Sequence, residues 1–414
     1  MRDRDLYASI LGIEAPWSVV DVKLDQPGKK VEVFLEYDGE TVCPECREVC
    51  GGYDFRERRW RHLDTCQFQT ILIAKVPRVD CKKDGVRQMP VPWAEKNSQF
   101  TAMFESLVID WLHESNVAAV ARVMGLSWDE VQGIMHRAVE RGLERRKLSL
   151  PTGLGVDETS FQKRHEYVTL VCDRCEGEVV HVADGRSEEA LTSFYKQFSR
   201  EELGAIDTIS MDMAAPYIKA THACVPEAED KISFDKFHVA QHLGEAVDKV
   251  RRDENKKLML DGDERLKGTK YLWLQNPANM SKRNSLSLDT LKGTVLRTAR
   301  AWAIKEAAMS LWDFTSWTRA KRAWLRWYGW AIRSRLEPVK AVARMVKTHL
   351  VGILNAVVTG VTNAMSEGGI NAAIQRIKYN ARGYRNRANF RIAIYFHLGG
   401  LDLYPRPCGA HTTS

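Results

Sequence analysis

The spacing of apolar residues changes character several times along this chain of 414 residues. Apolar and polar positions alternate in residues 20–24 and 31–37, and residues 70–76 form a short apolar run, so we expect three β-strands there. From residue 100 to about residue 146, apolar residues recur at helical spacing instead. The first hundred residues are therefore predicted to be rich in β-structure, and the next fifty to be helical.

The helical segment is interrupted at Gly125, which separates two short helices. Ser127 is expected to cap the second helix, with Glu130 as its capping-box partner three residues on. Two short helices joined through a glycine turn are typical of a helix-turn-helix, although a hairpin buried in a core has the same pattern. A basic stretch follows and favours DNA binding: Arg137, Arg141, Arg145, Arg146 and Lys147.

From residue 153 onward the pattern is that of an α/β domain. Strands are expected at 153–161, 167–172, 178–182, 206–211 and 231–235, with a helix at 188–198 capped by Ser187. Three antiparallel strands, a helix and then alternating strands and helices are the order expected for a ribonuclease-H-like sheet. After Asp235 the chain is predicted to be helical almost to its end.

Composition excludes two broad classes. A hydrophobic content of 44% and a charged content of 28% are ordinary for a folded protein, so wholesale disorder is not expected. No stretch reaches the ~18 to 20 apolar residues that a membrane span needs, and the first residues lack the apolar core of a signal peptide. We therefore expect a cytoplasmic protein without a membrane partner, whose nine cysteines are thiols or metal ligands.

The net charge of +7 is modest, but basic residues gather in a few segments, which suits a polyanionic partner. The simpler interpretation of any single segment is a solvated surface. These segments are residues 56–61, the stretch with Arg319, Lys321, Arg322 and Arg326, and residues 376–391.

Two cysteines in the β-rich part have the spacing of metal ligands. Cys43 and Cys46 enclose a two-residue turn, from which both sulfurs can point at one ion. Cys81 is the best candidate for a third zinc ligand. The fourth ligand remains open among the following residues: Asp84, Cys66, Cys50 and His62. A reduced loop without metal is the alternative.

Two carboxylates lie at the ends of apolar, strand-like runs, Asp157 after Val156 and Asp212 after Met211. A carboxylate at the end of a buried strand is costly unless it faces solvent, a partner or a metal. If the two strands are neighbours, the acids lie side by side, and divalent cations relieve their repulsion. A third acid from a helix completes a two-metal site for phosphoryl displacement.

Glu367 is the candidate for this third acid. On a helix that begins near residue 366, Glu367, Asn371 and Lys378 fall within roughly 60° of one another at ~100° per residue. The segment that follows contains Arg382 and Arg385, which are placed to contact phosphates. Each of these acids, taken alone, is more often a helix cap or a surface charge.

Six of the twelve tryptophans lie between residues 302 and 330. On the helix expected at 316–335 the aromatic residues share one face, and arginines gather on the opposite one. We expect the aromatic face to pack in a core and Arg319, Arg322 and Arg326 to meet DNA phosphates. A sharper alternative is that Trp330 stacks on an unpaired base.

These features together resemble the ISL3 family of insertion-sequence transposases over nearly the whole chain. The resemblance is carried by the CPEC turn, the helix-turn-helix, and the motifs GVDE at 155–158, FDKFH at 234–238, SEG at 366–368 and RGY at 382–384. It implies a DDE transposase whose ribonuclease-H-like core, with the triad Asp157, Asp212 and Glu367, is interrupted by an all-helical insertion. It also implies that family members carry a cysteine or histidine where this chain has Asp84.

The resemblance gives Asp235 and His238 a place in an Asp-x-x-His motif found near the active site of related transposases. They are expected to position the DNA strand or support the site, as are Asn371 and Lys378. The alternative is that Asp235 caps a helix and His238 packs beneath it.

The expected domains are a β-rich zinc finger at 1–97 and a helix-turn-helix at 98–150. A ribonuclease-H-like core at 151–250 and 361–414 is divided by a helical insertion at 251–360.

The predicted protein is a bacterial, nucleoid-associated homodimer that binds the terminal inverted repeats of its element and target DNA. It is expected to cut and join DNA with two Mg2+ or Mn2+ ions per active site and to hold a structural Zn2+. The rivals are a DNA-binding regulator without catalysis and a nuclease that does not join strands.

Overall fold

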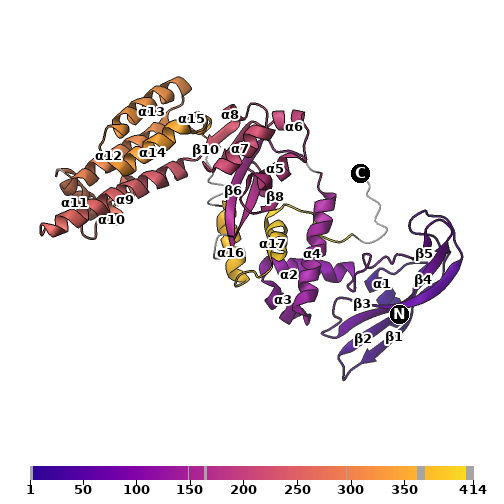
Figure 1. Cartoon of the computed structure of the whole chain (residues 1–414). Helices are drawn as coiled ribbons and strands as arrows, with labels where there is room; N and C mark the ends of the chain where they lie inside the picture. Colours follow the sequence, from indigo (N-terminus) through magenta and orange to yellow (C-terminus); the bar gives the residue numbers. More distant parts are fainter. Residues whose placement is uncertain (1–2, 148, 163–165, 295, 361–368, 407–414) are drawn as a thin grey trace. The chain divides into compact units, whose positions relative to one another are not determined.

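The structure is a computed structural model of the whole chain, and it describes residues 3–147, 149–162, 166–294, 296–360 and 369–406. The chain divides into two compact units (Figure 1). Unit 1 comprises residues 1–147 together with residues 395–414, and unit 2 comprises residues 148–394.

Unit 1 begins with helix α1 (Asp3–Leu11) and a five-stranded sheet. The strands are β1 (Trp17–Asp25), β2 (Lys30–Tyr37), β3 (Gly52–Arg61), β4 (Gln69–Cys81) and β5 (Gly85–Gln88). Their order is β1-β2-β4-β3, with β5 also paired to β4. The three strands predicted from the apolar pattern are confirmed. The core of this sheet is closed by Trp93, whose ring lies 4.8 Å from that of Trp17 and 5.4 Å from that of Trp60.

Three helices follow the sheet in unit 1, namely α2 (Ala102–Glu114), α3 (Val117–Met124) and α4 (Trp128–Arg145). Gly125 ends α3 with a φ of 65°, a left-handed conformation that favours glycine. Ser127 and Glu130 form the predicted capping box at the start of α4. The turn between α3 and α4 is therefore set by local sequence.

The arginines of α4 have an internal role. Glu105, which is 1% exposed, accepts hydrogen bonds from Arg137 and Arg141. Arg141 also donates to Glu95 and to the carbonyl of Leu403. Arg145 is likewise paired, with Asp402. Three members of the basic stretch are therefore paired within unit 1, and these three give weaker support to DNA binding than the sequence suggested.

Unit 2 is built on a mixed sheet with the strand order β10-β9-β6-β7-β8. Its strands are β6 (Gly153–Gln162), β7 (Glu166–Asp173), β8 (Glu178–Asp184), β9 (Thr208–Met211) and β10 (Ile232–Phe234). Neighbours among β6, β7 and β8 pair antiparallel, whereas β9 runs parallel to β6 and β10 parallel to β9. Four helices connect these strands: α5 (Glu188–Tyr195), α6 (Arg200–Gly204), α7 (Ala215–Cys224) and α8 (Ala228–Lys231).

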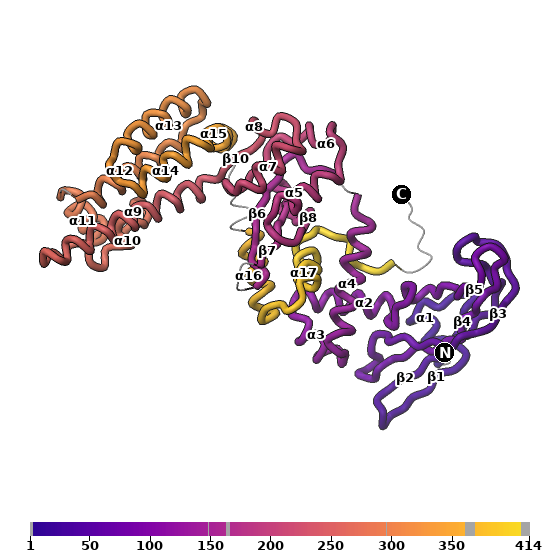
Figure 2. Tube along the Cα trace, viewed as in Figure 1, coloured from indigo at the N-terminus to yellow at the C-terminus, as the bar shows by residue number. Residues whose placement is uncertain are grey.

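A group of helices follows β10. It comprises α9 (Lys236–Leu260), α10 (Lys270–Leu274), α11 (Lys282–Lys292), α12 (Arg297–Ser310), α13 (Trp317–Ile332), α14 (Glu337–Thr348) and α15 (Leu350–Thr359). Figure 2 shows α9 leading away from the end of β10 and α15 returning to that strand. Two more helices, α16 (Asn371–Asn380) and α17 (Arg387–Leu398), complete the described chain, and α17 runs from unit 2 into unit 1.

The aromatic face of α13 lies in the core, as predicted, with Trp324 and Trp327 buried. Trp317, expected on the same face, is 38% exposed at the first residue of the helix, and Lys321 lies over its ring at 4.6 Å.

In the part of the chain that the structure describes, no single helix is long and apolar enough to cross a membrane. The pair α14 and α15 passes that test by length and composition, but it is bent by 74°.

Candidate functional site

Three carboxylates occupy neighbouring positions at one edge of the sheet in unit 2, each from a different strand or strand end. In the parallel pairing of β6 with β9, Gly155 lies opposite Ser210, and Asp157 and Asp212 each come two residues later. In the pairing of β9 with β10, Met211 lies opposite Phe234, so Asp212 and Asp235 follow their strands at the same level. The parallel arrangement therefore brings Asp157, Asp212 and Asp235 to neighbouring positions.

The three acids differ in their surroundings. The Asp212 side chain is 44% exposed, whereas Asp235 is 4% exposed. Asp212 accepts a hydrogen bond from the Met213 amide at 2.5 Å, and Asp157 accepts one from the Glu158 amide at 2.7 Å. Asp235 caps α9 by accepting from the Phe237 amide at 3.2 Å. The capping role proposed for Asp235 is therefore present, at the same edge as the other two acids.

Helix α16 lies along β6 beside Asp157. The Asn371 amide donates to Asp157 Oδ2 at 2.5 Å, and Lys378 Nζ donates to the Ser160 carbonyl at 2.6 Å. Asn371 and Lys378 thus share the face of α16 that meets β6, as their spacing predicted. Burial lowers the pKa of Lys378, in keeping with its place against the strand. Asn371 Oδ1 is buried and has no hydrogen-bond partner among the described residues.

Two histidines lie near Asp212, one on α9 and one at the junction of α14 and α15. His238 on α9 places Nδ1 at 3.6 Å from Asp212 Oδ1. His349, between α14 and α15, packs edge-on against the Phe234 ring at 5.2 Å. Burial lowers the pKa of His349, while the Asp212 carboxylate acts to raise it. Sequence reasoning missed His349, because nothing local marks a residue at the junction of two helices.

The third predicted acid, Glu367, lies outside the described residues. The structure therefore places Asp157 and Asp212 together with Asn371, His238 and Asp235.

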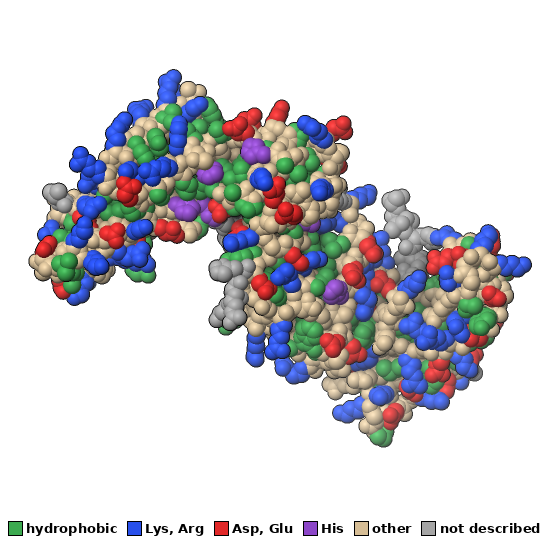
Figure 3. Space-filling view, viewed as in Figure 1, with side chains coloured by type: hydrophobic (Ala, Val, Ile, Leu, Met, Phe, Trp, Pro, Cys, Tyr) green, Lys and Arg blue, Asp and Glu red, His purple; other side chains and the backbone are tan. Residues whose placement is uncertain are grey.

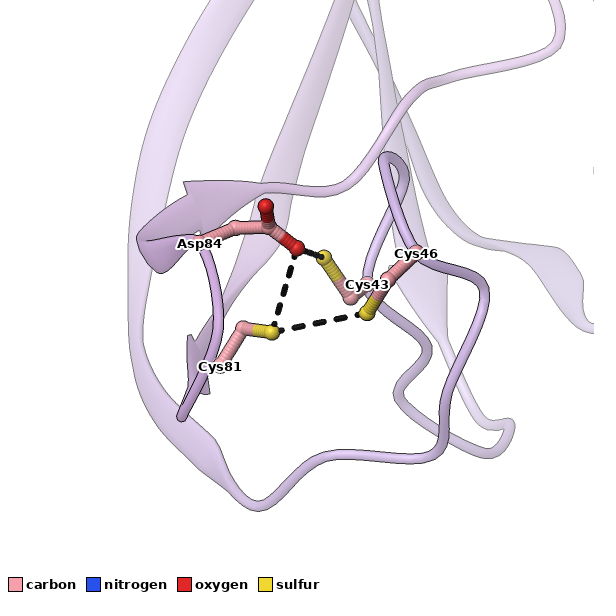
Figure 4. A group of neighbouring side chains, drawn as sticks. All are labelled: Cys43, Cys46, Cys81 and Asp84. Atoms are coloured by element: carbon pink, nitrogen blue, oxygen red, sulfur yellow. Dashed lines mark hydrogen bonds between the residues drawn. The ribbon is translucent and has the colours of Figure 1, made fainter.

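A second cluster lies in unit 1, at the zinc-ligand candidates (Figure 4). Ligand atoms of Cys43, Cys46, Cys81 and Asp84 all lie within 4.8 Å of one another. Asp84 Oδ2 is 3.4 Å from the sulfurs of both Cys43 and Cys81, and the sulfurs of Cys46 and Cys81 are 3.5 Å apart. Hydrogen bonds from the thiols lower the pKa of Asp84. Three thiols and one carboxylate at these separations are a donor set that suits one tetrahedral zinc ion.

The other candidates for the fourth ligand are not in this group. Cys66 is exposed in the turn between β3 and β4. His62 is buried and shares a hydrogen bond of 2.9 Å with Thr101. Cys50 packs against the cluster from the side, and its thiol is 3.4 Å from the Glu48 carbonyl.

Basic side chains are exposed on α13 and beyond α16. Figure 3 shows lysine and arginine side chains spread over the helical part of unit 2. Arg319, Arg322 and Arg326 are all exposed on the face of α13 opposite its buried tryptophans. Arg382 and Arg385 are exposed after the end of α16. Within the described residues none of these five arginines forms an ion pair with a carboxylate.

Three family models match successive parts of the chain. A transposase model of the ISL3 type, with a DDE catalytic domain, matches residues 154–394. The helix-turn-helix domain of transposase family ISL3 matches residues 89–139. The zinc-finger of transposases of the elements IS204, IS1001, IS1096 and IS1165 matches residues 39–84, which contain the cysteine cluster.

Two relatives are similar over nearly the whole chain. The transposase for insertion sequence element IS1001 of Bordetella parapertussis is 28% identical over 401 residues, which cover 95% of this chain and 98% of the relative. The transposase for insertion sequence element IS1557 of Mycobacterium tuberculosis is 28% identical over 423 aligned residues, covering 93% of each chain. Both alignments include both units described above.

Proposed function

Because this chain belongs to the ISL3 family of DDE transposases, enzymes that cleave DNA and transfer its strands, we propose that Asp157, Asp212 and Glu367 form its catalytic triad. The observation that carries the proposal is the parallel register that brings Asp157 and Asp212 together, with Asn371 bonded to Asp157. Asp157 and Asp212 offer carboxylate oxygens, the ligands that Mg2+ prefers.

Two Mg2+ or Mn2+ ions fit this donor set in our proposal. When bound, they would activate the attacking hydroxyl and stabilise the leaving oxygen of an in-line displacement. The Asn371 side-chain NH2 group orients Asp157 by donating to its carboxylate. The Asn371 Oδ1 atom remains available as an acceptor in the site. His238 contacts Asp212, and Asp235 caps the start of the helix that carries His238. Lys378 anchors α16 to β6.

The proposed reaction has two steps. A water molecule attacks the phosphate at the transposon end, a new P–O bond forms, and the bond to the 3′-oxygen breaks, which frees a 3′-hydroxyl. That hydroxyl then loses its proton and attacks a phosphodiester of the target DNA. A new P–O bond joins the transposon 3′-oxygen to the target strand, and the target's own P–O3′ bond breaks and leaves a 3′-hydroxyl on the target. Cutting both ends together requires two active sites, so we propose that the protein acts as a homodimer.

In the proposed architecture, a zinc finger (1–97) and a helix-turn-helix (98–150) recognise the terminal inverted repeats. A ribonuclease-H-like core (151–250 and 361–414) carries the triad and is interrupted by a helical insertion (251–360). The mixed sheet with β9 and β10 parallel to β6, followed by the helices α9 to α15, supports this division. The exposed arginines of α13 and those after α16 contact phosphates of the DNA.

The zinc finger is held, in this proposal, by one Zn2+ bound to Cys43, Cys46, Cys81 and Asp84. The clustering of these four ligand atoms supports that set over one with Cys66.

Substitution of the acids tests the proposed triad. Asp157→Asn, Asp212→Asn and Glu367→Gln should each abolish cleavage of DNA that carries the element's ends and leave binding to those ends intact. Asp207→Asn is the matched control, since Asp207 is an exposed acid just before β9, at the other end of the strand from Asp212. Metal-dependent nicking and strand-transfer products are measured together. Normal cleavage by all three triad variants would rule the assignment out.

A further inference from the structure

We propose that the exposed side of α16 and the turn after it guide the DNA strand that carries the phosphate to be cut. We call this surface the α16 track and define it by Arg376, Tyr379, Arg382 and Arg385. Within the track, Tyr379 stacks on an unpaired base of that strand. The inference rests on the proposed function, because it takes Asp157 as part of the catalytic site.

The position of the track is fixed by contacts on the other side of α16. Asn371 bonds to Asp157, Gln375 Nε2 lies 3.4 Å from Thr159 Oγ1, and Lys378 bonds to the Ser160 carbonyl. After the helix, the Tyr384 carbonyl accepts from Gln162 at 3.0 Å. The helix and the turn therefore run along β6 from Asp157 toward Gln162. A strand lying on the track leads directly to the catalytic edge.

Tyr379 is unusually exposed for an aromatic side chain. It is 84% exposed, more than any other large apolar or aromatic side chain in the described part of the chain. At ~100° per residue, Tyr379 stands about 80° around the helix from Asn371, and Arg376 stands about 60° further on. The ring is thus held beside the face that meets the site, next to an arginine, and makes no contribution to the core.

The charge of the segment fits a nucleic-acid strand. Residues 368–401 contain no aspartate or glutamate, but they contain five arginines and one lysine. Arg387 and Arg391 form ion pairs with Glu166 and Asp184, and Lys378 is bonded to β6. The three arginines of the track remain exposed and form no ion pair within the described residues. Their charges are therefore available for phosphates.

The composition of the track favours a single strand over a continuous duplex. Exposed aromatic rings between cationic side chains bind unpaired bases by stacking, while the cations follow the backbone. In an intact duplex the base faces are covered by their neighbours, so a ring can stack only where a base is unpaired. From Asn371 to Tyr379 the helix rises ~12 Å, which corresponds to about three to four nucleotides at ~3.4 Å each. Tyr379 is thus expected to meet a base at that distance from the cut.

A fluorescent base placed in the DNA end tests this position. The full-length Asp212→Asn protein is bound to end-containing DNA with 2-aminopurine at each of the first five or so positions from the cut. Its emission should change at about three to four nucleotides from the cut and not at the other positions. Tyr379→Ala should remove that change and weaken end binding about 5- to 100-fold, whereas Tyr379→Phe should retain both.

Tyr271 provides the matched control. It is 73% exposed on α10, so Tyr271→Ala removes an equally accessible ring from another helix of unit 2 and should change neither signal. Arg376→Gln should weaken binding at every end sequence and lower the salt dependence by about one counterion.

The outcomes separate this inference from the proposed function. If the wild type cleaves ends while Tyr379→Ala matches it in binding and in fluorescence, the track is wrong and the triad stands. If Tyr379→Ala weakens binding to the element's ends and binding to a fully paired duplex of unrelated sequence by the same factor, the stacking role is wrong. If neither the wild type nor Tyr379→Phe cleaves or binds ends, the proposed function itself fails, and the track fails with it.

Discussion

His62 is a buried histidine just after β3, and its environment keeps it neutral. It is 5% exposed, and burial, reinforced by the charge of Arg61, lowers its pKa to about 4. The unfolded chain has an ordinary histidine pKa of roughly 6.5, so between these values the unfolded state binds the extra proton. The stability that neutral His62 contributes is present above about pH 6.5 and is lost as the pH falls through about 4.

We therefore expect acid to destabilise unit 1 partly through His62, by on the order of 2 kcal/mol. Chemical unfolding of the wild type and of His62→Gln at pH 7 and at pH 4.5 measures this, because the stability difference between them should shrink at the lower pH. A constant difference for His62→Gln would contradict the prediction.

Asp84 is the residue at which the proposed zinc site departs from the usual sulfur and imidazole ligands of structural zinc. A thiolate in its place would complete a four-cysteine site. We expect Asp84→Cys to raise zinc affinity at least ~10-fold and Asp84→Ala to lower it, as measured by competition with a chromogenic chelator. Cys66→Ser should leave zinc affinity unchanged. Loss of zinc from Cys66→Ser alone would instead make Cys66 the fourth ligand.

Single residues also show where sequence reasoning succeeds. Asp157 and Asp212 were identifiable because each ends a hydrophobic run, where a carboxylate without a partner, a metal or solvent is energetically costly. Cys43 and Cys46 were identifiable by their spacing and Cys81 by its place after a strand-like segment. Asp84 could be chosen among four candidates only once the loops were placed in space. His349 and the buried Glu105 could not be predicted, because their partners lie on distant segments. Glu367 stays a prediction.

At the scale of elements, α15 is packed unusually closely against β10. A Cβ on Gly352 would lie 2.5 Å from two ring carbons of Phe234, so only glycine allows this approach. Asn355, one turn further on, donates to the Ile232 carbonyl at 2.9 Å. Since Asp235 follows Phe234, this packing helps to set the position of the acidic edge.

We predict that Gly352→Ala destabilises unit 2 by about 1 to 3 kcal/mol and reduces DNA cleavage, because the added methyl displaces Phe234. Thermal unfolding and an end-cleavage assay measure the two effects. Gly244→Ala is the control on α9, where a Cβ would meet Leu274 at an ordinary 3.7 Å. That change should be neutral or slightly stabilising, as alanine is the better helix former. Equal behaviour of the two variants would refute the close-packing argument.

Some helices and strands could be predicted from the sequence, and others could not. The strands with alternating apolar residues were predicted, and so was the α3–α4 turn, where glycine and the capping box act locally. Strand β3 was not, because its exposed arginines hide the period of two, and only Trp60 reaches the core. Strand order could not be read from the chain at all, although it decides that Asp212 lies between the other two acids.

At the scale of the whole molecule, the proposed zinc belongs to unit 1 alone. Its three cysteine ligands belong to, or pack against, the small cluster that contains Val79 and Met89, so the metal supplements a limited hydrophobic core. Adding a strong zinc chelator to the full chain should lower the melting temperature of unit 1 and leave that of unit 2 unchanged. Differential scanning calorimetry with and without chelator measures this. A shift of both transitions, or of neither, would contradict it.

Because residues 395–406 belong to unit 1, this unit can be completed only late in synthesis. Arg141 bonds to the Leu403 carbonyl, and the Tyr404 hydroxyl donates to Asp110 at 2.7 Å, so segments that lie before and after unit 2 in the sequence build one unit. A ribosome therefore releases the last pieces of unit 1 only after it has translated all of unit 2. A messenger RNA that ends before the codon for residue 395 yields helices α2 to α4 without their contacts to Leu403 and Tyr404. Premature termination is thus expected to give poorly folded fragments rather than a free DNA-binding unit that competes for the element's ends.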